Sequence, residues 1–293
     1  ELVGRSHECD YPPEVAALPA LTRARLPSSA SSAAIDADVR ALVERALALY
    51  EVELDALARA NPDVVVTQDL CEVCAVPFSA VCRAVDAVLG GSTRVLSLRP
   101  ERLADVWDDV RRVARAIGRP EAGEALAREL AARARAVSER VPANAARPAV
   151  LSVEWIAPVM IGGLWMPELI ELGGGVPLVT RPGERAPTLG REALARLEPD
   201  VVLVKPCGFT LERTLAERGA IADALPWDGW RAVREGRVYV ADGNAYFNRS
   251  GPRLVESLEL LAACTHPAHF ADFRERHTAA LRRLTHAGDD VPA

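Results

Sequence analysis

A short segment occurs twice in this chain, and it constrains the fold more than any other feature of the sequence. Residues 55–66 read DALARANPDVVV and residues 192–203 read EALARLEPDVVL. Each copy has a carboxylate, a short amphipathic helical pattern, a Pro-Asp pair and a run of apolar, mostly β-branched residues, and a cysteine follows each run. A repeat of this kind predicts two lobes of related construction.

The rest of the chain alternates between strand and helix patterns in the same way. Helical spacing is clear over 37–60, and further strands are predicted over 1–6, 93–98, 149–155, 200–204 and 236–242. Strands that alternate with helices favour parallel sheets covered by helices. The predicted fold is therefore α/β, with two parallel-sheet lobes.

Residues 120–141 predict one long helix between the two lobes. The segment is apolar at helical spacing, it has a proline at its first turn, and Pro142 follows it. At about 1.5 Å per residue such a helix is roughly 30 Å long, which suits a rigid bridge. We therefore predict an N-terminal lobe over 1–119, a bridging helix over 120–141 and a C-terminal lobe over 142–293, with a ligand cleft between the lobes.

Polar and aromatic side chains follow the predicted strands. In open α/β sheets, ligands bind beyond the carboxyl ends of the strands. The candidate ligand-binding residues at these exits are His7, Glu8, Cys9, Gln68, Cys71, Cys74, Glu154, Trp155, Asn244 and Tyr246.

Cysteines are concentrated at the same strand exits. Cys9, Cys71 and Cys74, with Cys207 from the second lobe, could supply the thiolates that zinc, copper or an iron–sulfur centre prefers. A disulfide or redox pair and simple packing remain alternatives for Cys71 and Cys74. The acidic neighbours Asp69 and Glu72 disfavour a reactive redox thiolate.

Several function classes are disfavoured by the sequence. A net charge of −6 argues against a nucleic-acid-binding surface, and no nucleotide-binding or hydrolase motif occurs. The segment 162–175 reads GGLWMPELIELGGG, which predicts a loop with an exposed Trp165, counted among the ligand-binding candidates, then a helix and a glycine cap. We expect a binding protein that is not an enzyme and requires no cofactor.

The order of these motifs resembles one family over almost the whole chain. The segments VGRSHECDYPPEV (3–15), LARANPDVVV (57–66), LARLEPDVVLV (194–204) and GRVYVADGNAYFNRSGPRLVESLELLA (236–262) are similar to those of the helix-strut (class III) substrate-binding proteins of ABC importers for cobalamin and ferric siderophores. The resemblance implies two α/β lobes bridged by one helix, with the ligand held between them. From the comparison with that family, we expect the first strand–helix unit to be incomplete in this sequence.

The resemblance also implies partners. They are a small-molecule ligand, which is a corrinoid such as cobalamin or a metal chelate, and an ABC permease with its ATPase. The protein would be a monomer that binds no nucleic acid. It would act in the periplasm or cell envelope if an export signal was removed, and in the cytoplasm otherwise. The alternative function is a metal-binding or redox protein on the same fold that uses a thiol-lined cleft.

Individual site residues can be carried over from the family by position. Tyr11 belongs to the Asp-Tyr-Pro loop and Arg249 matches a ligand-contacting arginine. Asp55 and Glu192, which open the two repeats, match the carboxylates that pair with permease arginines. The family's cobalamin-binding members place aromatic residues at the positions of three polar residues here, which are Glu8, Gln68 and Glu154.

Overall fold

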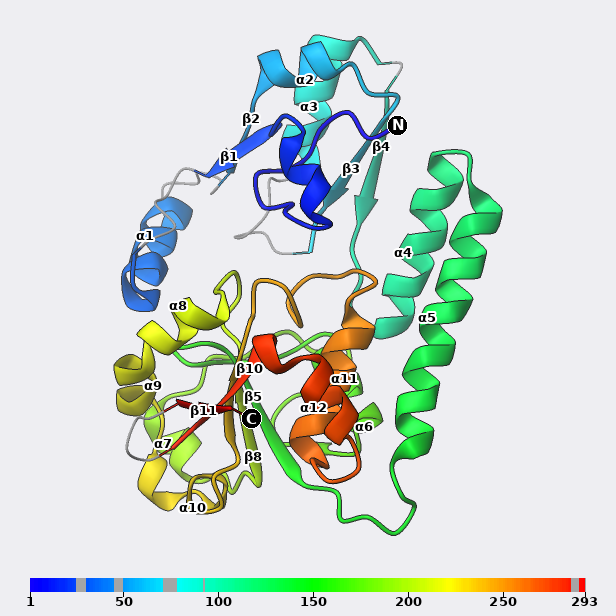
Figure 1. Ribbon diagram of the computed structural model, residues 1–293. Coiled ribbons are helices and arrows are strands. Elements are labelled where there is room, and N and C mark those ends of the chain that lie inside the picture. The colour runs from blue at the N-terminus through cyan, green and yellow to red at the C-terminus, as the bar shows by residue number, and fades with distance from the viewer. Residues whose placement is uncertain (25–29, 45–49, 71–77, 92, 286–289, 293) are drawn as a thin grey trace. The chain divides into compact units, whose positions relative to one another are not determined.

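The chain forms two compact units. The structure is a computed structural model of the 293-residue chain and describes residues 1–24, 30–44, 50–70, 78–91, 93–285 and 290–292. Unit 1 comprises residues 1–99 and 111–123, and unit 2 comprises residues 100–110 and 124–293. Among the described residues, each sheet contains strands of one unit only (Figure 1). The predicted boundaries at 119 and 141 stay a prediction.

Unit 1 is built on two small sheets. Strands β3 and β4 are parallel, with Val64 opposite Arg94, and β1 and β2 are antiparallel. Leu57 and Val85 belong to a small apolar core where α2 and α3 pack on β3 and β4. The elements are η1 (Pro13–Ala17), β1 (Thr22–Ala24), α1 (Ser32–Glu44), β2 (Tyr50–Val52), α2 (Leu54–Ala60), β3 (Val64–Gln68), α3 (Phe78–Leu89) and β4 (Arg94–Leu98).

Two helices contain residues of both units. These are α4 (Leu103–Ala116) and α5 (Pro120–Arg140), and the bounds of α5 agree with the predicted helix to within one residue. Its role as a bridge between lobes stays a prediction. None of the described helices combines the length and the apolar composition that a membrane crossing requires.

Unit 2 contains a seven-stranded mixed sheet. Its central strands β5 (Ala149–Trp155), β8 (Val201–Val204) and β9 (Val238–Ala241) are parallel. The expectation of purely parallel sheets is wrong, because β10 pairs antiparallel with β9, β11 pairs antiparallel with β10, and β6 pairs antiparallel with β5. The added strands are β6 (Met160–Ile161), β7 (Val176–Pro177), β10 (Leu281–Leu284) and β11 (Asp290–Pro292).

Helices cover both faces of this sheet (Figure 1). Helices α7 to α10 pack on one face through an apolar core that includes Leu194, Ile221 and Trp230, and α6 and α11 pack together on the other side. All four residues of β8 are buried, as expected for a parallel strand covered on two faces. The helices are α6 (Met166–Leu172), α7 (Arg191–Ala195), α8 (Leu211–Ala216), α9 (Arg218–Ala224), α10 (Arg231–Arg234), α11 (Leu254–Thr265) and α12 (Ala271–Arg276), with η2 (Trp227–Gly229) and η3 (Thr278–Ala280).

Two predicted elements of unit 1 are wrong. The expected strand over residues 1–6 is only a single bridge between Arg5 and Ala20, because no neighbouring strand extends the pairing. The expected continuous helical region over 37–60 is interrupted by β2, whose Tyr50 and Val52 have the aromatic and β-branched side chains that favour strands, and which pairs with β1.

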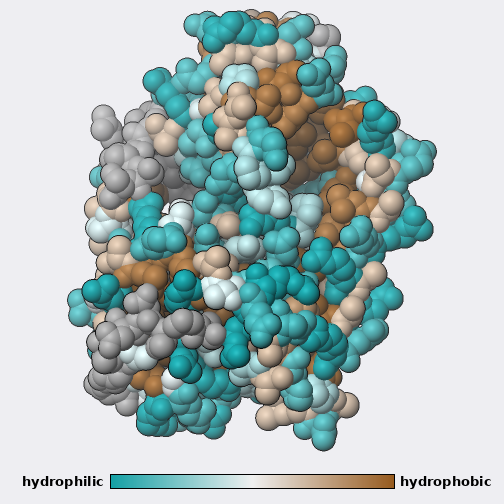
Figure 2. All heavy atoms as spheres, viewed as in Figure 1, coloured by the Kyte–Doolittle hydropathy of each residue, from teal (hydrophilic) through white to brown (hydrophobic). Residues whose placement is uncertain are grey.

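Unit 1 also leaves more apolar surface uncovered. Figure 2 shows apolar surface gathered over its helices and strands. Most of the large apolar side chains that are exposed among the described residues belong to unit 1, namely Leu2, Val3, Tyr11, Leu54, Val66 and Ile117. Val66 in β3 is 45% exposed, although a run of apolar, β-branched residues is typical of a buried strand. Among the described strands, the only neighbour of β3 in its sheet is β4.

Candidate functional site

The carboxyl ends of β5, β8 and β9 form the candidate site of unit 2. Glu154 and Trp155 end β5, Lys205 follows β8, and Asp242 follows β9. Because these strands are parallel and adjacent, their ends lie at one edge of the sheet. We call this region, with Cys207 and the loop 242–249, the strand-exit face.

Hydrogen bonds join the three strand exits. The backbone N–H of Cys207 donates to the Glu154 carbonyl oxygen (3.0 Å), and the N–H of Asn244 donates to the Phe209 carbonyl oxygen (2.9 Å). The ring of Phe209 meets the half-buried ring of Trp155 edge-on, with the ring centres 5.3 Å apart. The structure therefore brings together Glu154, Trp155, Cys207 and Asn244, as expected for residues that follow parallel strands of one sheet.

The loop after β9 presents the predicted arginine. The carboxylate of Asp242 accepts from the N–H groups of Asn244 (3.0 Å) and Ala245 (2.7 Å), which closes the turn. Arg249 then donates from Nη2 to the side-chain oxygen of Asn244 at 2.6 Å, and both side chains are half-buried. This contact holds the guanidinium at the edge of the loop.

Tyr246 is held between cationic and aromatic neighbours. The guanidinium carbon of Arg253 lies 4.3 Å from the centre of the tyrosine ring, and His277 meets the ring edge-on at 6.2 Å. Burial alone would lower the pKa of Arg253, but Tyr246 and Glu256 outweigh this effect and raise it. The ring is therefore fixed by the cation–π contact beside a guanidinium that stays charged.

Lys205 was not predicted as a site residue, although it is central to the strand-exit face. Its side chain is fully buried, and Nζ donates to Asn248 Oδ1 (2.8 Å) and Glu154 Oε2 (3.3 Å). Burial lowers the pKa of Lys205, while Glu154 and Cys207 oppose that shift. The available signal was a lysine directly after an uninterrupted buried strand.

Trp165 differs from its predicted state. The expected exposure is wrong, since only 4% of the residue is accessible. The indole N–H donates to the Phe247 carbonyl oxygen at 2.7 Å, which satisfies the polar group of a buried tryptophan. Trp165 thus contacts the loop that contains Tyr246. The following helix α6 begins at Met166.

In unit 1, the predicted residues His7, Glu8, Cys9 and Tyr11 share one loop. Arg5 organises it, because its Nη1 donates to the carbonyl oxygens of Ser6 (3.1 Å), His7 (3.2 Å) and Cys9 (3.1 Å). Of these four candidates, His7 is half-buried, and Glu8, Cys9 and Tyr11 are exposed.

His7 is engaged within this unit. Its Nδ1 lies 2.8 Å from Thr22 Oγ1, and its ring centre lies 4.9 Å from that of Tyr50. Its Nε2 lies 3.3 Å from Glu8 Oε1, at ion-pair distance but without hydrogen-bond geometry. Because Nε2 is itself buried, the structure shows neither ring nitrogen open to a ligand.

The predicted thiol cluster is only partly described. Gln68 is the exposed last residue of β3, while Cys71 and Cys74 lie outside the described residues. Cys9 is exposed in unit 1 and Cys207 in unit 2. Within the described ranges, no group of three or more His, Cys, Asp or Glu side chains could hold a metal ion. The metal-site hypothesis for Cys9, Cys71, Cys74 and Cys207 stays a prediction.

The two predicted docking carboxylates occupy equivalent places. Asp55 lies in the first turn of α2 and Glu192 in the first turn of α7. Both are exposed, and in each helix the leucine two residues later, Leu57 or Leu194, is buried. Each helix is therefore anchored by its leucine while its carboxylate faces solvent.

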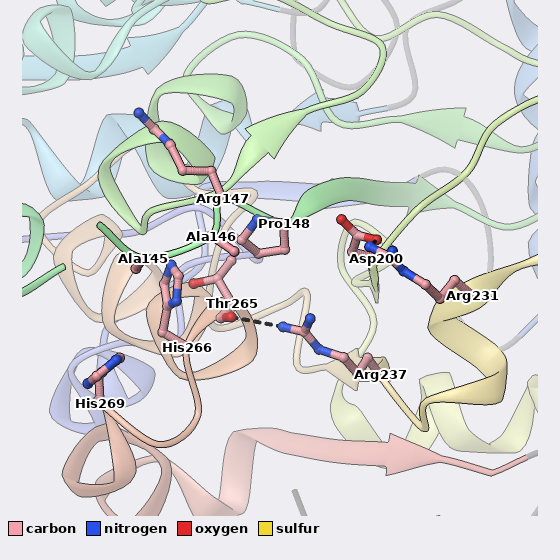
Figure 3. Close-up of a pocket in the computed structure, with 10 residues that line it drawn as sticks. All are labelled: Ala145, Ala146, Arg147, Pro148, Asp200, Arg231, Arg237, Thr265, His266 and His269. Atoms are coloured by element: carbon pink, nitrogen blue, oxygen red, sulfur yellow. Dashed lines mark hydrogen bonds and ion pairs between the residues drawn. The ribbon is translucent and has the colours of Figure 1, made fainter. Parts of the chain in front are cut away.

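A pocket of about 340 Å³ lies at the opposite end of the same strands (Figure 3). Its lining residues include Pro148, Asp200 and Arg237, which directly precede β5, β8 and β9 respectively. The side chain of Arg231 turns toward Asp200 and forms an ion pair with it.

The other two arginines of this pocket donate hydrogen bonds to carbonyl groups at helix ends. Arg237 donates to the carbonyl oxygens of Cys264 (3.1 Å) and Thr265 (2.8 Å) at the end of α11, and Arg147 donates to the Glu171 carbonyl oxygen (3.0 Å) near the end of α6. Such contacts satisfy carbonyl groups that a helix leaves without partners. The charge of this pocket is thus structural, and the strand-exit face remains the candidate site.

Comparisons with known proteins agree with this architecture. A family model described as periplasmic binding protein matches residues 30–245. No curated protein matches the sequence.

Solved structures with the same fold include three of known ligand type. A periplasmic heme-binding protein from Pseudomonas aeruginosa has a TM-score of 0.67 at 21% identity, covering 91% of this chain and 85% of that one. The periplasmic heme-binding protein RhuT from Roseiflexus sp. RS-1 has a TM-score of 0.66 at 20% identity, with 91% and 90% covered. The vitamin B12-binding protein BtuF of Vibrio cholerae has a TM-score of 0.60 at 16% identity, with 94% and 89% covered. At these identities the likeness establishes the fold.

Proposed function

The chain belongs to the periplasmic binding protein family, and from this premise we propose that it captures a corrinoid or another metal chelate for an ABC import system and delivers it to a membrane permease. Family membership confirms the resemblance drawn from the sequence, and it confirms a substrate-binding protein rather than an enzyme. The proposed place of action is the periplasm or cell envelope.

The strand-exit face is the observation that carries the ligand proposal. It combines the half-buried ring of Trp155, the fixed ring of Tyr246 and the guanidinium of Arg249. Aromatic rings suit the flat apolar faces of a macrocyclic chelate, and a guanidinium pairs well with carboxylate or amide groups at its edge. The heme and vitamin B12 ligands of proteins with the same fold support this ligand class.

A binding experiment tests the ligand class directly. Purified protein is titrated with cobalamin, hemin and a ferric chelate while the absorption spectrum is recorded. We expect one of these probes to bind, and Trp155→Ala and Arg249→Ala to weaken that binding by about tenfold each. Arg128→Ala, which removes an exposed arginine of α5, is the matched control and should bind as the wild type does. Absence of binding by all three probes would reject the ligand class.

The docking proposal concerns Asp55 and Glu192. Exposed carboxylates at equivalent places in the two units are suited to pair with permease arginines, which sets orientation and encounter rate. The double variant Asp55→Lys/Glu192→Lys should abolish permease-dependent uptake in reconstituted vesicles and leave ligand affinity unchanged. Glu198→Lys reverses an exposed charge nearby in the sequence and should transport normally. Normal uptake by the double variant would contradict the docking role.

A further inference from the structure

Lys205 is a buried charged residue at the strand-exit face, where a charged side chain could otherwise reach a ligand. It directly follows β8 at the strand-exit face, yet none of its surface is accessible. Taking an ammonium group out of water is unfavourable unless it is paired and hydrogen-bonded. The hydrogen-bond partners of Lys205 therefore indicate its structural role.

The partners of Lys205 come from two other strand exits. Nζ donates to Glu154 Oε2 (3.3 Å) at the end of β5 and to Asn248 Oδ1 (2.8 Å) in the loop after β9. The Asn248 side-chain N–H₂ donates in return to the carbonyl oxygens of Lys205 (2.9 Å) and Gly243 (2.8 Å). The asparagine amide is thus held at both ends by the same lysine.

Two glycines, Gly243 and Gly162, allow close packing around this lysine. A Cβ atom at Gly243 would lie 2.1 Å from the Pro206 carbonyl oxygen and 2.7 Å from that of Lys205. A Cβ atom at Gly162 would lie 3.4 Å from Lys205 Nζ and 2.8 Å from Ser152 Oγ. The loop after β9 therefore lies directly against the loop after β8, with Lys205 in the contact.

We propose that Lys205 is a positioning residue for ligand binding. It anchors Asn248, so that the loop 243–249 presents Tyr246 and Arg249 in one fixed arrangement. It also balances the charge of Glu154, which would otherwise repel the carboxylates of an anionic ligand. This inference rests on the proposed function, and it adds that the strand-exit face is pre-formed and suited to ligands that carry carboxylate groups.

The test separates positioning from general stability. Lys205→Met alone leaves Glu154 without its cation, so the double variant Lys205→Met/Glu154→Gln removes both charges and should recover most of the lost melting temperature. Asn248→Leu removes the anchored amide while Lys205 keeps its pairing with Glu154. Arg237→Met is the control for stability, since it removes the carbonyl contacts at the opposite end of the strands.

Two readouts are measured on the full chain, namely affinity for hemin and cobalamin, and amide hydrogen exchange over 243–249. We expect the double variant and Asn248→Leu to lose about tenfold in affinity and to exchange about tenfold faster in this loop. Arg237→Met should melt at a lower temperature with unchanged affinity and unchanged exchange in the loop.

Either of two results would overturn the proposal. One is unchanged loop exchange in the double variant, and the other is faster exchange with wild-type affinity. If the wild type binds neither probe, the proposed ligand class is wrong, and the exchange result alone then decides whether Lys205 anchors the loop.

Discussion

The two copies of the repeat fold alike, yet they are buried to very different extents. In each copy a short helix precedes a strand, α2 before β3 in unit 1 and α7 before β8 in unit 2. The helices behave similarly, since Leu57 and Leu194 are both buried. The strands do not, because Leu203 is inaccessible whereas Val66, at the equivalent position of the repeat, is 45% exposed.

Burial of a strand therefore depends on its neighbours in the fold and not on its sequence alone. Strand β8 lies between β5 and β9 and is covered by helices on both faces, while β3 pairs with β4 alone among the described strands. The exits differ accordingly. Lys205 after β8 is locked into a buried network, and Gln68 at the end of β3 is exposed. An apolar run therefore predicts a strand more reliably than it predicts a core.

The largest expected effect on stability comes from truncating Leu203 in β8, compared with Val66 at the equivalent position of β3. We expect Leu203→Ala to lower the free energy of unfolding by about 3 kcal/mol, because it removes a fully buried side chain and leaves a cavity. Val66→Ala should change it by less than about 0.5 kcal/mol. Urea unfolding followed by tryptophan fluorescence reports unit 2, where all five tryptophans lie, and hydrogen exchange reports both units. Equal effects would show that β3 is covered as fully as β8.

A second contrast lies in the ion pairs of the two units. Glu259 is buried in unit 2 and accepts from His277 (2.8 Å), Arg276 (3.0 Å) and Arg133 (3.2 Å). We expect Glu259→Gln to destabilise unit 2 by about 2 kcal/mol, since charge-assisted hydrogen bonds are lost from a buried site. Glu51→Gln, which removes one of the two carboxylate partners of exposed Arg23 in unit 1, should cause no resolvable change. Thermal unfolding of both variants measures the difference.

The same carboxylate predicts a pH dependence. Burial alone would raise the pKa of Glu259, but the hydrogen bonds from His277, Arg133 and Arg276 outweigh burial and lower it. A lowered folded-state pKa contributes stability that is complete above the usual glutamate pKa of about 4.3 and is lost as the pH falls through the lowered value. The stability difference between wild type and Glu259→Gln should therefore shrink below about pH 4. A constant difference down to pH 2 would refute this linkage.

For the cysteines that follow β3 and β8, the expected effect is smaller and concerns ligand affinity alone. If Cys71 and Cys74 contact the ligand or its metal, Cys71→Ser/Cys74→Ser should lower ligand affinity more than threefold, or about 0.7 kcal/mol. Cys207→Ser tests the exit after β8 in the same titration with cobalamin, zinc and ferric chelates. Because metal binding requires thiolates, any metal affinity should also fall at lower pH. Affinities within threefold of wild type for every probe would assign these cysteines to packing.

The smallest effect on stability is expected at the carboxylates that open the repeats. Asp55→Lys and Glu192→Lys each change an exposed side chain, so each should alter the free energy of unfolding by less than about 0.5 kcal/mol. The melting temperatures of the two single variants test whether the two units tolerate the change equally. A loss above 1 kcal/mol in either would mean that the carboxylate stabilises its helix, so that a transport defect could not be assigned to docking alone.

Much of the local structure could be predicted because it depends on neighbouring residues. The apolar run over 149–155, the helix from Pro120 and both copies of the repeat appear in the structure as the patterns indicated. The positions of Glu154, Trp155, Cys207 and Asn244 at one sheet edge could also be predicted, since parallel strands of one sheet end on the same side.

The family, the alternation of strands and helices, and the residue types at the strand exits could all be predicted from the sequence, because they depend on spacing along the chain. The tertiary contacts were needed to show that β10 pairs antiparallel with β9 and β11 antiparallel with β10, that Trp165 is buried and that β3 is half exposed. They were also needed to show that Lys205 faces inward to Glu154 and Asn248. The physical reason is that burial and polar pairing depend on which distant segments supply the neighbours, and those contacts are not encoded in any local pattern.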